Sequence, residues 1–112
     1  MHEFSIAQSI IDIAEEIATK EKADQIQSID IEIGALSGVV LDALEFALKI
    51  TVGGTILGES QINFFPIPGK AACNDCNLRF ETSDLLAICP GCGGGSLEII
   101  DGKQLRVKSL TV

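Results

Sequence analysis

Hydrophobic residues near the start of the chain recur with the period of a helix. Between Phe4 and Lys22 the apolar side chains are three, four and seven residues apart, as on one face of an amphipathic helix. This face consists of Phe4, Ala7, Ile10, Ile11, Ala14, Ile17 and Ala18. Glu15, Glu16, Lys20 and Glu21 lie elsewhere on the helix, so we expect one buried face and one solvated face.

The next segment changes to a period of two. From Ile26 to Ile33, isoleucines alternate with polar residues, which predicts a strand with one wet face. Ile29, Ile31 and Ile33 are its expected core residues, and Gly34 ends the strand.

The rest of the chain predicts a second helix and two further strands. The helix is expected from about Val39 to Val52, with Ser37 as its N-cap. Strands are expected from about Ser60 to Pro66 and from Gln104 to Thr111. This order predicts an α+β fold, in which two helices pack on a small three-stranded sheet.

A cysteine-containing segment interrupts this α/β pattern before the last strand. We expect it to form an inserted module over residues 70–97, while residues 1–69 together with 98–112 form the α/β domain. Pro66-Ile67-Pro68-Gly69 lies just before the module and is a candidate hinge.

The four cysteines form two CxxC pairs, Cys73-Asn-Asp-Cys76 and Cys89-Pro-Gly-Cys92, separated by twelve residues. A CxxC turn aims two thiolates at one point, and zinc takes four thiolates in a tetrahedron. Asn77 and Gly93 follow the pairs, and both residue types tolerate the left-handed backbone that turns N–H groups toward sulfur. The spacing predicts a zinc ribbon, and four protein ligands make its Zn²⁺ structural rather than catalytic.

Other cysteine chemistry fits less well. Two disulfides are disfavoured if the protein is cytoplasmic, as the lack of a signal peptide and of a long apolar stretch leads us to expect. A thioredoxin-like redox CxxC comes singly. An iron centre with four thiolates remains an alternative.

Composition narrows the classes of function. The formal net charge is −8, which disfavours binding to phosphate backbones, and no membrane partner is expected. The chain has one histidine and no phosphate-binding glycine loop, so we expect no enzyme and no catalytic residues. The cysteines alone would suit a zinc-ribbon adaptor or a transcription-related interaction module, which is the alternative interpretation.

The single histidine, His2, is next to the N-terminal Met1. The Met1 α-amine, the His2 amide nitrogen and the His2 imidazole Nδ1 can close two adjacent chelate rings on one metal. Planar nitrogen donors suit Ni(II) or Cu(II). Glu3 offers a fourth donor through its amide nitrogen or its side chain.

In several segments the chain resembles the HypA/HybF family of hydrogenase nickel-incorporation proteins. The matching segments are Met1-His2-Glu3, the following Phe4-Ser5-Ile6-Ala7, Ile31-Glu32-Ile33-Gly34-Ala35-Leu36-Ser37-Gly38, Gly53-Gly54-Thr55, Leu105-Arg106-Val107-Lys108 and the two CxxC pairs. Together they cover essentially the whole chain. Two positions depart from the family pattern, because members commonly carry an acid in place of Ala35 and often carry an acid near Thr111.

The resemblance implies a nickel metallochaperone for [NiFe]-hydrogenase maturation. Ni²⁺ would be transient cargo at Met1, His2 and Glu3, and Zn²⁺ would be held by Cys73, Cys76, Cys89 and Cys92. The implied partners are a nickel-handling GTPase of the HypB type and the hydrogenase large-subunit precursor, and some members also serve urease. A homodimer is an open alternative.

Overall fold

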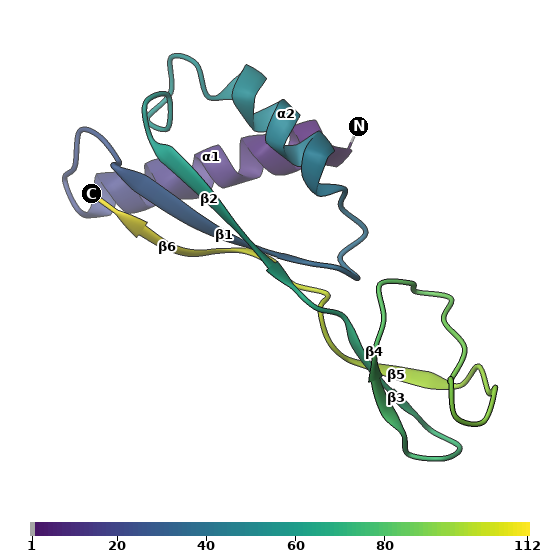
Figure 1. Cartoon of the computed structure of the whole chain (residues 1–112). Coiled ribbons are helices and arrows are strands. Elements are labelled where there is room, and N and C mark those ends of the chain that lie inside the picture. The colour runs from purple at the N-terminus through teal and green to yellow at the C-terminus, as the bar shows by residue number, and fades with distance from the viewer. Residues whose placement is uncertain (1) are drawn as a thin grey trace. The chain divides into compact units, whose positions relative to one another are not determined.

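The computed structural model describes residues 2–112, except for the side chain of His2. Its elements, in chain order, are α1 (His2–Lys20), β1 (Ser28–Gly34), α2 (Leu41–Thr51), β2 (Gln61–Ile67), β3 (Lys70–Cys73), β4 (Arg79–Glu81), β5 (Leu97–Asp101) and β6 (Leu105–Thr111). One three-stranded sheet has the order β2-β1-β6 and a second has the order β4-β3-β5. The predicted α+β class is confirmed, with two helices on a three-stranded sheet (Figure 1).

The chain forms two compact units. The first, called the helical unit here, takes in Met1–Ile31, Val39–Phe65 and Arg106–Val112. The second, called the cysteine unit, takes in Glu32–Gly38 and Pro66–Leu105. The module boundaries predicted from the sequence, at residues 70 and 97, stay a prediction. Neither described helix is long and apolar enough to cross a membrane.

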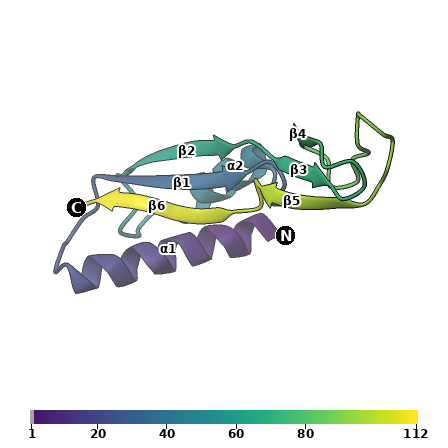
Figure 2. The ribbon, with the colours of Figure 1, turned by 90° about the horizontal axis from the view of Figure 1, so that it is seen from below.

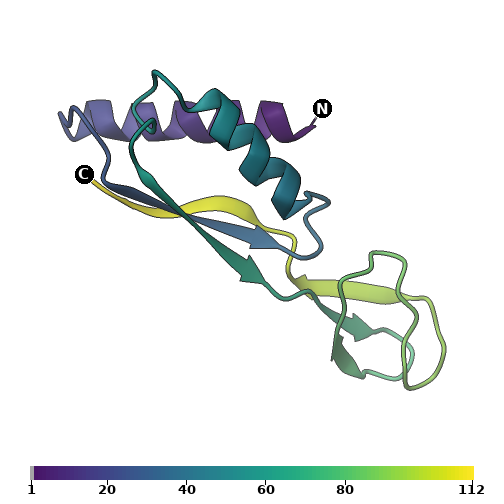
Figure 3. The same ribbon diagram turned by 45° about the horizontal axis from the view of Figure 1, so that its top comes forward.

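The helices of the helical unit cover one face of the sheet (Figure 3). Ile29 and Ile31 of β1 are fully buried, as their alternation predicts. The buried side chains of the two helices are Ala7, Ile10, Ile11, Ala14 and Ala18 of α1 and Leu44, Ala47 and Leu48 of α2. Removing these apolar surfaces from water is the main force that holds the helices to the sheet.

Backbone hydrogen bonds set the directions of the three strands. The Gln61 N–H donates to Gln27 O (2.9 Å), and the Ala35 N–H donates to Ile67 O (2.9 Å), so β1 and β2 run parallel, with α2 as their crossover. The β6 strand runs antiparallel to β1, as Figure 2 shows. Two bonds define that pairing, from Gln27 N–H to Thr111 O and from Gly34 N–H to Gln104 O, each 2.7 Å.

The ends of the helices differ from expectation. The α1 helix begins at His2 rather than Phe4. It closes with Lys22 at φ 54° and with the Ala23 N–H donating to Ala18 O (2.8 Å), which is a Schellman-type end. The N-cap of α2 is Val40, which makes no side-chain cap hydrogen bond, so the prediction of Ser37 as the cap was wrong.

Candidate metal centre

Each cysteine pair sits in a tight backbone knuckle in the cysteine unit. In the first knuckle, which follows β3, the Cys73 N–H donates to Leu78 O (2.8 Å) and the Asn77 N–H donates to Cys73 O (2.9 Å). The second knuckle repeats the pattern, from Cys89 N–H to Gly94 O and from Gly93 N–H to Cys89 O, each 2.9 Å.

The residue after each second cysteine has a left-handed backbone, as the sequence predicts. Asn77 has φ 65° and Gly93 has φ 74°. This conformation folds the chain back toward the sulfur atoms. The backbone itself therefore fixes where each pair of thiols points.

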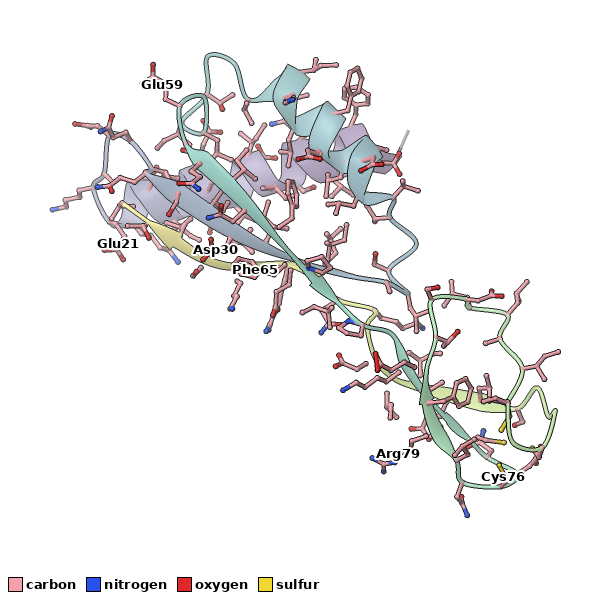
Figure 4. The ribbon with its side chains drawn as sticks, viewed as in Figure 1. Glu21, Asp30, Glu59, Phe65, Cys76 and Arg79 are labelled. Carbon is pink, nitrogen blue, oxygen red and sulfur yellow. The ribbon has the colours of Figure 1, made fainter. Side chains whose placement is uncertain are left out.

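The two knuckles bring all four sulfur atoms to one place. The four Sγ atoms lie within 4.8 Å of one another, and Figure 4 shows them gathered around Cys76. Two of the separations between the knuckles are 3.6 Å, from Cys73 to Cys92, and 3.5 Å, from Cys76 to Cys89. A tetrahedron with Zn–S bonds of about 2.3 Å has edges of about 3.8 Å, so this cluster has the size that zinc requires.

Backbone N–H groups modify the acidity of these thiols. The pKa of Cys89 is lowered to about 7, mainly by the Cys92 N–H and also by the Gly91 N–H, which lies 3.3 Å from the Cys89 Sγ. The Gly94 N–H lowers the pKa of Cys92, but the neighbouring sulfurs of Cys73, Cys76 and Cys89 together with desolvation outweigh it and raise this pKa to about 12. Binding of a metal at this cluster would displace the remaining thiol protons.

Two of the four cysteines are shielded from solvent. Cys73 and Cys89 are buried, whereas Cys76 and Cys92 are exposed. Two hydrogen bonds that the sequence did not predict connect the first knuckle to the segment just after the second. They join Asn74 and Ser96 by a backbone bond of 2.9 Å and a side-chain bond of 3.1 Å from Nδ2 to Oγ.

The predicted nickel ligands are only partly described. Glu3 lies in the first turn of α1 and is partly exposed. Met1 and the side chain of His2 lie outside the described residues. A nickel site at these three residues thus stays a prediction.

Comparison with known proteins decides the family. A family model described as hydrogenase/urease nickel incorporation, metallochaperone, hypA matches residues 1–112. The chain belongs to this HypA family. The resemblance drawn from the sequence motifs is confirmed, and with it membership among the nickel-incorporation metallochaperones of hydrogenase maturation.

Two curated relatives are hydrogenase maturation factors named HypA. The protein of Parabacteroides distasonis is 41% identical over 112 residues, which cover 100% of this chain and 97% of the relative. The protein of Geotalea daltonii is 39% identical, with 100% and 99% covered. These relatives are described as maturation factors rather than as enzymes.

Two solved structures share the fold. One is the solution structure of the Ni metallochaperone HypA from Helicobacter pylori, with a TM-score of 0.67 and 23% identity over 97% of this chain and 95% of the other. A second solution structure of a HypA protein has a TM-score of 0.69 and 24% identity over 99% and 95%. At this identity the likeness shows the fold of this HypA-family chain.

Proposed function

We propose that this chain binds Ni(II) at its N-terminus and delivers it to the [NiFe]-hydrogenase large-subunit precursor, together with a nickel-handling GTPase of the HypB type. The observation that carries the proposal is the match to the nickel-incorporation family over residues 1–112, in a chain that starts Met1-His2-Glu3. The mechanism is exchange of ligands on the metal, without any catalytic step. The cytoplasm is the compartment in which such a delivery would take place.

The start of α1 supports this ligand set. The helix begins at His2, and the first four N–H groups of a helix have no carbonyl within the helix to accept them. The amide nitrogens of His2 and Glu3 are therefore free of helical hydrogen bonding and available to a metal that displaces their protons. Planar nitrogen donors suit Ni(II).

We further propose that Cys73, Cys76, Cys89 and Cys92 hold one structural Zn²⁺. The residues fit the metal, because four thiols converge at tetrahedral spacing and N–H groups point at the sulfurs. Bound there, zinc would cross-link the two knuckles and leave no open position for chemistry. The zinc site would thus stabilise the protein while nickel moves through the N-terminus.

The nickel proposal is tested by titrating Ni(II) into untagged, zinc-loaded protein and into its His2→Ala variant. Loss of the imidazole breaks a chelate ring, so we expect nickel affinity to fall at least about 100-fold. The affinity of the unchanged protein should also fall as the pH drops, because His2 must be neutral to bind and the Met1 amine and the amide nitrogens must lose their protons.

The matched control keeps His2 and adds Gly-Ser before Met1. It moves the free amine out of the chelate and should lose nickel as His2→Ala does, while zinc stays near one per chain in every variant. Equal nickel affinity in the wild type and in His2→Ala would refute the N-terminal site.

A further inference from the structure

The two edges of the sheet β2-β1-β6 carry different side chains. The β6 edge has Arg106 and Lys108, and charged residues discourage an edge strand from pairing with another chain. The β2 edge (Gln61–Ile67) has no charged residue at all. Figure 2 shows β2 at the border of the sheet, with β1 on one side only. An uncharged edge of this kind is a template for an additional strand.

The backbone of β2 has hydrogen-bonding groups that face away from β1. The Gln61 N–H donates toward β1, to Gln27 O. Successive peptide groups of a strand alternate in direction, so the N–H and C=O groups of Ile62 and Phe64 point to the open side. Pro66 occupies the next outward position, where its missing N–H costs no bond to β1. The open edge therefore centres on Ile62 and Phe64.

A groove of about 350 Å³ lies between α2 and this strand, lined by apolar side chains together with Glu45, Lys49 and Ser60. Leu48 of α2 and Val52, which caps the end of α2, line one side, and Ile62 and Phe64 of β2 line the other. A strand added beside β2 would place every second side chain next to those of Ile62 and Phe64, and hence at this groove.

The opposite face of β2 carries Asn63 and Phe65, which already have partners. The Asn63 Nδ2 donates to Asp30 Oδ1 (2.9 Å), and the Lys108 Nζ lies 4.7 Å from the centroid of the Phe65 ring. Figure 4 shows Asp30 and Phe65 on this helix-free face. The other half of the side chains on an added strand would therefore meet a face on which the Phe65 ring lies among the polar groups of Asn63 and Lys108. The two faces together select a segment in which apolar and polar residues alternate.

The charge of the chain indicates whether the added strand comes from a second copy of this chain or from another protein. Each chain has a formal net charge of −8, so two copies repel one another as they approach. Glu45 and Lys49 both line the groove, so the groove itself is close to neutral, and Glu59 adds a negative charge two residues before β2. The negative chain attracts a basic partner protein, whereas it repels a second copy of itself.

We propose that β2 takes up an extended segment of a different protein by strand addition. The segment is basic, with apolar residues at alternate positions that enter the groove between α2 and β2. This proposal goes beyond the delivery of nickel, and it depends on neither the nickel proposal nor the zinc proposal.

The test begins with selection from a displayed library of random twelve-residue peptides on zinc-loaded protein held through its C-terminus. We expect the enriched peptides to be positively charged and to alternate apolar with polar residues. Ile62→Lys should weaken their binding at least about tenfold, because an inward lysine must be buried when a strand is added. Gln61→Lys adds the same charge on the other face and should bind as the wild type does.

Selective N-methylation of an enriched peptide tests the backbone bonds without any change to the protein. Methylating the amides that face β2 should reduce affinity at least about tenfold, whereas methylating the alternate amides should not. Equal effects of the two patterns would overturn strand addition, as would the absence of enriched peptides or the enrichment of acidic ones. Sedimentation that shows a dimer of the wild type, abolished by Ile62→Lys, would identify a second copy as the occupant and also overturn the proposal.

Discussion

Replacing Cys89 with serine should unfold the cysteine unit and leave the helical unit folded. Of the seventeen buried apolar residues described, twelve lie in the helical unit and five in the cysteine unit. Those five are Ile33, Leu36, Ala71, Cys73 and Cys89. Two of them are proposed zinc ligands, so the cysteine unit has almost no core of its own without the metal.

Because the cysteine unit has so few buried apolar residues, we expect loss of zinc to remove most of its free energy of unfolding. Binding of a structural zinc contributes about 10–16 kcal/mol in small zinc domains, which is comparable to the whole stability of a typical domain, about 5–15 kcal/mol. In amide NMR spectra we expect the signals of β3, β4 and β5 to collapse in Cys89→Ser, or when a strong chelator removes zinc. The signals of α1 and α2 should persist.

A change at the neighbouring knuckle residue serves as the control. Asn74→Ala removes the side-chain bond to Ser96 but leaves every thiol, so it should cost only about 1 kcal/mol and retain one zinc. Purified protein with only trace zinc, and with spectra of β3 to β5 that the chelator leaves unchanged, would contradict the zinc assignment.

Local patterns in the sequence predicted most of what the structure contains. The alternation of Ile29, Ile31 and Ile33 with polar residues correctly identified the buried side of β1. Side chains alternate between the two faces of any strand, so this feature depends on the local sequence alone. The cysteine knuckles were predictable for the same reason. Each closes within a few residues, so spacing and a left-handed Asn77 or Gly93 suffice to define it.

Features that depend on distant segments were not predictable. The second helix was expected to begin near Val39 with Ser37 as its cap, yet its N-cap is Val40, which is 61% exposed. The reason is that the preceding loop belongs to the cysteine unit, where the Leu36 N–H donates to Gly102 O (2.7 Å). No residue near α2 signals a partner more than sixty positions away. Likewise, the sequence shows that β2 has no charged residue, but only the strand order shows that β2 lies at the edge of the sheet.

Alanine at Gly102 should disrupt the cysteine unit as severely as any change outside the metal ligands. Gly34, Gly69 and Gly102 come together within this unit, where the chain leaves β1, enters β3 and leaves β5. A Cβ on Gly102 would lie 2.5 Å from the Gly69 Cα, and its φ of +98° is strained for any other residue. A Cβ on Gly34 would in turn overlap Gly102 O, and one on Gly69 would overlap Thr82 O.

These contacts are backbone to backbone, so no side chain can rotate to relieve them. We expect Gly102→Ala to lower the free energy of unfolding of the cysteine unit by about 3 kcal/mol or more, measured by amide hydrogen exchange of zinc-loaded protein. Gly95→Ala is the matched control in the same unit, because a Cβ there meets nothing within 4 Å, and it should be neutral or slightly stabilising. The same packing argues against Gly69 as a hinge, since its carbonyl accepts the Thr82 N–H at 2.9 Å. If alanine at 102 is tolerated as well as alanine at 95, these three segments do not meet as closely as the structure has them.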